Sequence, residues 1–255
     1  MMNTDTTKVD LLFNFKEAGL PISVAAPRNG QPSRHSWPGS VPIVRLSVRE
    51  SPKEHFMINI GDNKNRVEVL NTDKSFKQLV LLVKEPKREY TVPREDSNGK
   101  IKQIKEYTDP TERKYLMGFD EKHLFISGLP KEHINTVADA HQSLKHLVVV
   151  DAEKEGREIK RQGEYFFIPL TEKEEDELLT KVDKDAKIKC TRDKLSRGGH
   201  KPHFVRRLIK MRRGRKVYAL GIISHQDHDP LVLNNWHMVY INRETESPGI
   251  TGFVD

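Results

Sequence analysis

The chain of 255 residues contains a single cysteine, Cys190, and lacks long apolar runs. One cysteine excludes an internal disulfide, and a zinc site would need histidine and carboxylate ligands. The longest apolar stretches, such as residues 79–83 and 147–150, are far too short to cross a bilayer. The first ten residues lack the basic and then apolar order of a secretion signal. We therefore expect a protein of the reducing cytoplasm with no membrane partner.

Positive charge is present in excess and is concentrated in one place. The net charge is +7, and residues 187–216 contain thirteen Lys or Arg residues against one acid, Asp193. We call this segment the basic block. Segregated positive charge predicts a polyanion partner, RNA or DNA, whereas a surface kept only for solubility usually mixes both signs.

Strand-like patterns dominate the chain. They predict an α+β fold that is strand-rich and mostly antiparallel, with a few short helices. Three segments are expected. Residues 1–92 form an N-terminal arm and a small β unit, and residues 93–114 form a polar loop or linker. Residues 115–255 form an α+β unit that carries the basic block and most of the histidines.

Local patterns give more specific expectations for the first two segments. Residues 1–41 are rich in Pro, Gly and Ser, which favours an extended arm over a helix. Residues 55–60 and 66–70 are expected to form a hairpin around a GDNKN turn. The run QLVLLV, from residue 78, is apolar on both faces and predicts a buried strand.

In the third segment, residues 134–144 show helical spacing, and the run HLVVV, from residue 146, predicts another buried strand. Thr171 and Glu174 have the spacing of a capping box, which predicts a helix that buries Leu178, Leu179 and Val182. Gly163 precedes the strongly β-forming run YFFI and indicates a bulge or a close backbone contact. Residues 203–211 fit either a helix or a strand.

The basic residues are the first candidate site. Arginine binds phosphate through a planar, two-pronged group, and several lie close together here. Arg161, outside the block, flanks Gly163 together with Glu164, although the two could equally form a surface ion pair. The candidate nucleic-acid-binding residues are Arg161, Arg206, Arg207, Lys210, Arg212, Arg213, Arg215 and Lys216.

The histidines are the second candidate site, because five of the eleven fall within residues 197–242. His225, Asp227 and His228 are imidazole and carboxylate groups of the kind that bind a divalent metal, the one cofactor that the pattern suggests. Histidines can instead act without metal, as general acid and base on an RNA 2′-hydroxyl. The candidate catalytic residues are His225, His228 and His237, with His203 and Glu164 as further members.

The position of His237 depends on the chain between Leu231 and Ile241. A turn at Asn234 and Asn235 would bring His237 back toward the segment SHQDHDP. One straight strand would instead place it roughly 30 Å away at about 3.3 Å per residue. The alternative for every one of these histidines is a structural role at the surface or in a turn, where it would satisfy the loop backbone.

Two resemblances bear on this region. The segment DHDPL followed by WH is similar to the His-Asn-His nuclease motif, but Asn234 and His237 come too early for the second strand and helix of that unit. The pieces RQGEYFFIP, RGGHKPH and SHQDHDPLVLNNWHMVYIN resemble an uncharacterised family of bacterial and phage-associated proteins. That resemblance implies no activity. It implies one shared site or core containing Arg161, Glu164, His200, His203, His225, Asp227, His228, Trp236 and His237.

The sequence therefore predicts a nucleic-acid-binding protein, with phosphodiester cleavage by histidine or metal chemistry as its enzymatic hypothesis. One alternative is a non-catalytic subunit or regulator of a nucleoprotein complex, with protein partners. Another is an enzyme that acts on a small phosphorylated ligand.

Overall fold

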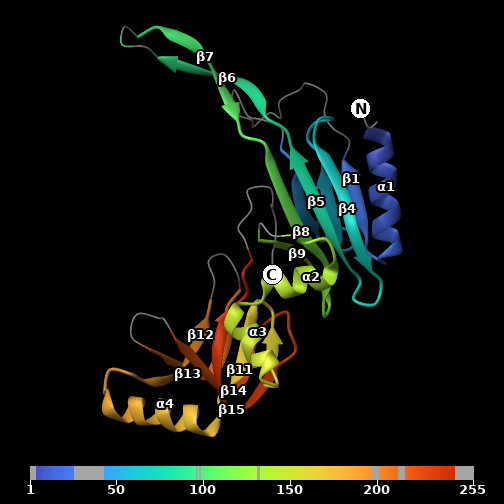
Figure 1. Cartoon of the computed structure of the whole chain (residues 1–255). Coiled ribbons are helices and arrows are strands. Elements are labelled where there is room, and N and C mark those ends of the chain that lie inside the picture. Colours follow the sequence, from blue (N-terminus) through green and yellow to red (C-terminus); the bar gives the residue numbers. More distant parts are fainter. Residues whose placement is uncertain are drawn as a thin grey trace. The chain divides into compact units, whose positions relative to one another are not determined.

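The computed structural model describes residues 4–25, 43–95, 97, 99–130, 133–196, 201–211 and 216–244, and fifteen strands and four helices lie within them (Figure 1). Strand β1 pairs in parallel with β3, and the other pairs of known register are antiparallel. The strand-rich, mostly antiparallel class is therefore confirmed. The chain forms two compact units.

The first unit contains the residues up to Phe119 and Leu124–Ala140. Its strands form a three-stranded sheet of order β1-β3-β2, a four-stranded sheet of order β4-β5-β8-β9 and a two-stranded hairpin β6-β7. The elements are α1 (Thr4–Glu17), β1 (Ile22–Ala25), β2 (Arg45–Arg49), β3 (His55–Asn59), β4 (Arg66–Asp73), β5 (Gln78–Glu85), β6 (Arg88–Glu95), β7 (Ile101–Thr108), β8 (Thr111–Asp120), β9 (His123–Gly128) and the start of α2 (Val137–Leu144).

Helix α1 corrects the prediction of an extended N-terminal arm. Leu11, Phe15 and Ala18 recur at helical spacing and are all buried in the core of the first unit. The ring of Phe15 meets Phe56 edge-on, with 5.7 Å between centroids. Pro, Gly and Ser are concentrated in the residues that follow, so composition averaged over 1–41 concealed a proline-free helix. Residues 26–42 of the predicted arm lie outside the described residues.

Strand pairing in this unit agrees with the sequence in one case and departs from it in another. Strand β5 is buried along almost all of its length, as its two-sided apolar pattern predicts. The expected hairpin between β3 and β4 is wrong, because β3 pairs with β1 and β2 whereas β4 pairs with β5. The intervening turn is present, with Asn65 Nδ2 donating to the Ile60 carbonyl at 2.7 Å, but it leads from one sheet to another.

The polar segment 93–114, predicted as a loop or linker, contains β7 and parts of β6 and β8. Strands β6 and β7 pair from Arg88 opposite Thr108 to Glu95 opposite Ile101. Figure 1 shows the hairpin continuing outward from the ends of β5 and β8. Strong polarity hid these strands, because both faces of a two-stranded ribbon meet solvent and no apolar alternation is needed.

The second unit contains Asp120–His123 and His141–Glu244. It is built on one antiparallel sheet of order β10-β11-β15-β14-β13-β12. Its elements after α2 are α3 (Leu147–Lys154), β10 (Lys160–Gln162), β11 (Tyr165–Pro169), α4 (Glu172–Lys184), β12 (Cys190–Leu195), β13 (His203–Lys210), β14 (Val217–Ser224) and β15 (Leu231–Ile241).

Helix α3 corrects the prediction of a buried strand at HLVVV. His146 caps the helix, its Nδ1 accepting the Val148 N–H at 3.3 Å, and Val149 and Ala152 are the buried residues. A short apolar run is compatible with a buried strand or a helix, and β-branched valines favoured the wrong alternative. Helix α2 lies within the segment predicted to be helical.

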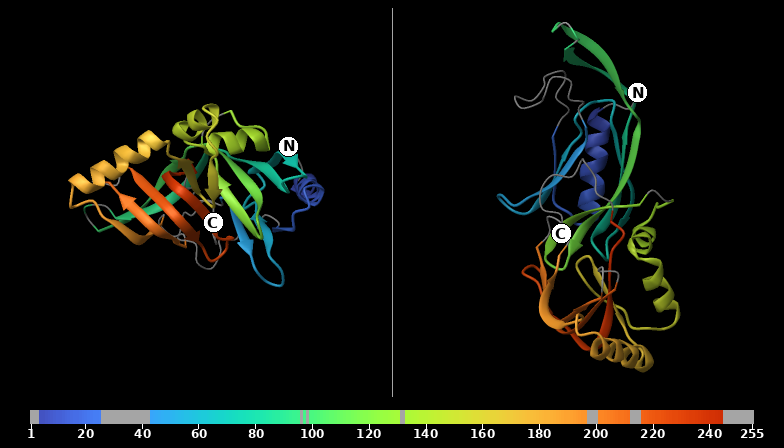
Figure 2. Two further views of the ribbon diagram at one scale, coloured as in Figure 1. Left: turned by 90° about the horizontal axis from the view of Figure 1, so that it is seen from below. Right: turned by 90° about the vertical axis from the view of Figure 1, so that its left-hand side faces the viewer.

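The sheet of the second unit has two differently covered faces. Tyr165 and Phe167 of β11 share one buried cluster with Leu195 of β12, at the opposite end of the strand order, so the sheet curls around this concave core. On the other face, which we call the outer face, α4 covers Ile209, Tyr218 and Trp236. Helix α3 covers the part of that face formed by β11. Figure 2 shows α4 lying across the sheet.

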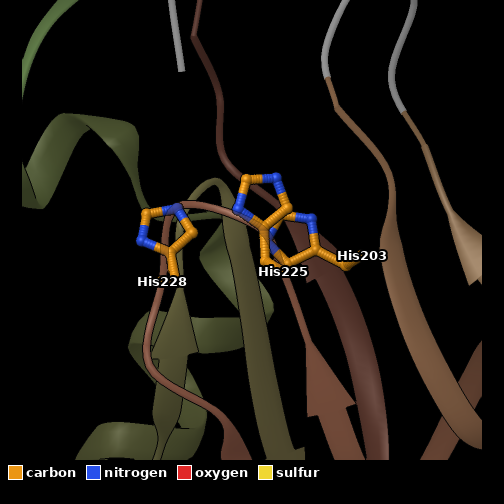
Figure 3. Close-up of side chains that lie close together, drawn as sticks. All are labelled: His203, His225 and His228. Atoms are coloured by element: carbon orange, nitrogen blue, oxygen red, sulfur yellow. The ribbon is translucent and has the colours of Figure 1, made fainter.

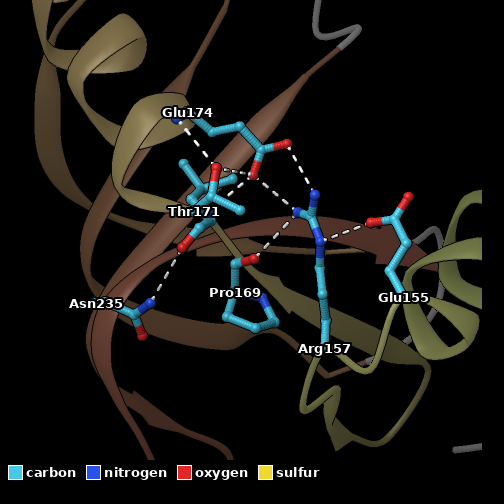
Figure 4. A network of polar contacts seen from close by, with 7 residues as sticks. Glu155, Arg157, Pro169, Thr171, Glu174 and Asn235 are labelled. Carbon is cyan, nitrogen blue, oxygen red and sulfur yellow. Dashed lines mark hydrogen bonds and ion pairs between the residues drawn. The ribbon is translucent and has the colours of Figure 1, made fainter.

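The start of α4 is held by the predicted capping box, which is confirmed (Figure 4). The Thr171 hydroxyl accepts the Glu174 N–H at 3.3 Å, and the Glu174 carboxylate accepts the Thr171 N–H at 2.8 Å. Arg157 donates to both carboxylate oxygens of Glu174, at 2.8 and 3.2 Å. Burial alone raises the pKa of Glu174, but the hydrogen bonds from Arg157 and Thr171 outweigh it and lower the pKa. Leu178 is buried as expected, whereas Leu179 is 41% exposed.

We expect Thr171→Ala to destabilise the second unit by about 1 kcal/mol, since it leaves an N–H at the helix start without its side-chain acceptor. Urea unfolding followed by Trp236 fluorescence, in a Trp37→Phe background, measures this change because Trp236 lies in the cluster under α4. The matched control is Thr180→Ala, an exposed position within the same helix, which should change stability by less than about 0.5 kcal/mol. Equal effects of the two substitutions would show that the cap contributes nothing.

Candidate histidine site

Three histidines from separate segments come together in the second unit (Figure 3). His203 begins β13, and His225 and His228 lie in the loop between β14 and β15. Each offers a ring nitrogen, and these atoms all lie within 4.8 Å of one another. His203 and His228 are buried, and His225 is half-buried. We call His203, His225 and His228 the histidine cluster.

The cluster forms because β13 and β14 pair in one register. Phe204 lies opposite Ser224, so the neighbouring residues His203 and His225 meet where the two strands end. Their rings stack with centroids 4.2 Å apart and an angle of 22° between planes. The ring of His228 approaches His225 at 4.7 Å and 31°.

Asp227 lies between two members of the cluster but is bound elsewhere. Its carboxylate oxygens accept from Lys201 Nζ at 2.9 and 2.7 Å. Burial raises the pKa of Asp227, but the hydrogen bond from Lys201, together with the nearby positive charge, outweighs it and leaves the pKa below its ordinary value. Its backbone N–H approaches His225 Nδ1 at 3.2 Å. His203, rather than Asp227, is thus the third residue that the fold brings beside His225 and His228.

Gly163 lies directly against the rings of His203 and His228. It is the first residue of the two-residue turn between β10 and β11 and has φ of +55°, as glycine in such a turn commonly does. A Cβ atom at this position would lie 3.1 Å from Nε2 of His228 and 3.2 Å from Nε2 of His203. Tyr165, just beyond the turn, meets the ring of His203 edge-on at 5.0 Å. The predicted close contact at Gly163 is therefore confirmed.

The other side of His228 faces a carboxylate that the sequence did not suggest. Glu121 Oε2 lies 3.7 Å from His228 Nδ1 and accepts the Asp229 N–H at 3.1 Å. Glu121 itself has φ of +54° in the turn between β8 and β9. The loop is fixed further by Gln162 Nε2, which donates to the Asp229 carbonyl at 2.6 Å. Nothing in the local sequence links residue 121 to residue 228.

Three further candidates are not members of the cluster. His237 sits within β15, which runs as one strand, and pairs with Pro169 and Ala219. Burial lowers the pKa of His237, against a raising contact from the Asn235 carbonyl, as suits a neutral histidine in the core. Arg161 lies over Phe166 at 5.6 Å, on the face toward α3, and its Nε donates to the Gly163 carbonyl. Glu164 is buried, and its Oε1 has no hydrogen-bond partner among the described residues.

The residues of the basic block differ in whether a carboxylate pairs with them. Arg206, Arg207 and Lys216 are exposed, and within the described part of the chain no carboxylate pairs with them. Lys210 is bound to Asp193 at 2.6 Å, and this contact lowers the pKa of Asp193. Four predicted residues lie outside the described residues: His200, Arg212, Arg213 and Arg215.

Comparison of the chain with protein-family models, curated proteins and solved structures finds no match. The family resemblance inferred from the sequence therefore stays a prediction. In the described ranges, no helix combines the length and the apolar character needed to cross a bilayer. The site must be interpreted from its own geometry.

We expect Gly163→Ala to disturb the histidine cluster, because the added methyl group would crowd both Nε2 atoms. The control is Gly156→Ala, which also has positive φ, +78°, but has no atom within 4 Å of the added Cβ. Both should lose about 1–2 kcal/mol from backbone strain. Only Gly163→Ala should lose about 1–3 kcal/mol more from overpacking and shift the NMR signals of the cluster imidazoles. Unchanged imidazole signals in Gly163→Ala would contradict this geometry.

Proposed function

We propose that the second unit binds single-stranded nucleic acid on the outer face of β13 and β14. The observation that carries the proposal is the side-by-side exposure of Phe204, Arg206 and Arg207 on that face. Val205 and Leu208 belong to the concave core, so Phe204 and Arg207 point the opposite way. Against β12, Arg206 and Arg207 together lie opposite the single residue Arg192, a bulge of β13 that allows the two arginines to share a face.

The surroundings of these arginines are apolar rather than acidic. Phe204 is 50% exposed, and the cross-strand pair Ile222 and Val232 is 45% and 50% exposed. The stem of Arg206 lies over Gly221, where an added Cβ would be 3.3 Å from its Cβ and Cδ. Exposed aromatic surface next to cations suits unpaired bases, which stack on rings while the backbone meets positive charge. A face kept only for solubility has no use for three exposed apolar side chains.

We expect the double substitution Arg206→Ala and Arg207→Ala to weaken binding of labelled single strands and to flatten its salt dependence. If each arginine neutralises one phosphate, the slope of log K against log salt should fall by about 1.4, or about 0.7 per phosphate. The control is Arg45→Ala with Arg49→Ala, two exposed arginines on β2 of the first unit. Fluorescence anisotropy at several salt concentrations measures both. Equal effects of the two double variants would leave only non-specific attraction.

Phe204→Ala should weaken single-strand binding by about 1–3 kcal/mol without changing the salt slope, because it removes a stacking surface and no charge. Phe76→Ala is the matched control, since Phe76 is 61% exposed in the first unit. A duplex that binds as tightly as a single strand, with no effect of Phe204→Ala, would exclude the stacking role. Mononucleotides that compete as well as oligonucleotides would favour a small phosphorylated ligand instead.

A second candidate function, phosphodiester cleavage, is favoured by the convergence of three imidazoles within 4.8 Å. One imidazole would take the proton of the attacking hydroxyl and another would protonate the leaving oxygen. Arg206 and Arg207 project from the opposite face, and Lys201, the cation beside the cluster, is paired with Asp227, so none of the three supplies an uncompensated positive charge for this chemistry.

Labelled RNA and DNA, incubated with and without added divalent metal, test cleavage. We expect His225→Ala to abolish it while His237→Gln retains it, because His237 lies in the core away from the cluster. Intact substrate at saturation under all conditions would leave a non-catalytic subunit of a nucleoprotein complex as the function. Because Cys190 is the single cysteine and is exposed, a reducing cytoplasm is the compartment that we propose.

A further inference from the structure

We propose that His203, His225 and His228 bind one first-row transition-metal ion such as zinc. Its open coordination positions would be left to water or to a ligand. This site is independent of nucleic-acid binding, since its donors lie on the concave side of β13 and the arginines on the outer face. Three imidazoles without a carboxylate favour zinc, cobalt, nickel or copper over magnesium and calcium, which prefer oxygen.

The separation of the donor nitrogens is close to what such an ion requires. Bonds of about 2.0–2.1 Å in a tetrahedron place ligand nitrogens about 3.4 Å apart. The cluster nitrogens lie within 4.8 Å of one another. Side-chain rotations that move the nitrogens by about an ångström would bring them to the spacing of a bound ion without moving the strands. The half-buried ring of His225 provides the route of entry.

Gly163 is the residue that two of the donor nitrogens face. Nε2 of His203 and Nε2 of His228 both face the point where a side chain at residue 163 would begin, at 3.2 and 3.1 Å. Glycine leaves that point without a side-chain atom, so nothing at residue 163 blocks an ion from approaching both nitrogens. Any other residue would fill it, so the glycine contributes to the site by the absence of a side chain.

A carboxylate lies near the second ring nitrogen of His228. His228 turns Nε2 toward Gly163 and Nδ1 toward Glu121, whose Oε2 is 3.7 Å away. In metal sites a ligating histidine commonly donates its second N–H to a carboxylate, which orients the ring and strengthens the ligand. Glu121 is therefore a positioning residue for His228 rather than a ligand.

Binding of the ion requires the stacked rings to turn. A nitrogen lone pair lies in the plane of its ring, and planes only 22° apart with centroids 4.2 Å apart do not meet within a bond length of both rings. Nδ1 of His225 accepts the Asp227 N–H, which leaves Nε2 of the same ring as the nitrogen available to the ion. Metal binding therefore changes the stacked rings into an arrangement in which their nitrogens point at one ion, and NMR detects this change directly.

The test uses the full chain, freed of metal with a chelator and titrated with Zn²⁺ and with Co²⁺. Calorimetry should give one ion per chain. Cobalt should give the visible absorption of a four- or five-coordinate site, and the imidazole NMR signals of all three histidines should shift. Added Mg²⁺ should not compete. His225→Ala should weaken zinc binding at least 100-fold, and Glu121→Gln about 10- to 100-fold.

Controls separate this site from other causes. His55→Ala, in the first unit, and His237→Gln should bind zinc as the parent chain does, and circular dichroism checks that each variant is folded. Arg206→Ala with Arg207→Ala should also retain zinc, so loss of nucleic-acid binding and loss of metal binding are distinguished. Absence of stoichiometric binding, or zinc binding that survives His225→Ala and His228→Ala, would overturn the proposal and leave a packed stack of histidines.

Discussion

The register between β13 and β14 is the constraint on which the second unit depends. Val205 lies opposite Ile223 and Leu208 opposite Ala219, and all four side chains are buried in the concave core. A slip of one residue would turn every side chain of β13 to the other face. His203 would then leave its partners, and charged side chains would enter the core. The burial of these apolar side chains, rather than of the histidines, thus fixes the register that brings the histidine cluster together.

The bulge in β13 explains how one strand supports two unlike surfaces. The segment HFVRRLIK does not alternate, because two basic residues are followed by two apolar ones. A regular strand would force Arg206 and Arg207 to opposite faces. The bulge of β13 opposite Arg192 lets both arginines project outward and returns Leu208 to the core. The same irregularity is why periodicity alone allowed either a helix or a strand at residues 203–211.

Features set by neighbouring residues were predictable, and features set by distant pairing were not. The capping box of Thr171 and Glu174 and the buried strand β5 follow from short patterns, and both are present. Helices α1 and α3 were missed because proline content and β-branched valines outweighed a short helical stripe. In each case the deciding contact is tertiary, such as Phe15 against Phe56.

The histidine cluster shows the same division. His225 and His228 are three residues apart, so their proximity was expected from sequence. His203 joins them only through strand register, and Glu121 only through a turn more than one hundred residues earlier in the chain. His237 is close in sequence but belongs to a straight strand, which carries it along the sheet instead of back to the loop. Distance along the sequence therefore does not decide which of these residues meet.

The separation of charge from imidazole also constrains what chemistry the cluster can perform. His203 lies on the concave side of β13, whereas the bulge places Arg206 and Arg207 on its outer face, so their guanidinium groups are not beside His203. Among the described residues, the cation next to the cluster is Lys201, and Asp227 already balances its charge. A phosphodiester bound there would bring a negative charge toward Glu121 with no surplus cation to receive it. A metal ion held by the three imidazoles would supply that charge, so cleavage at this site is chemically stronger with metal than without it. Nucleic-acid binding on the outer face requires neither the metal nor the histidine cluster.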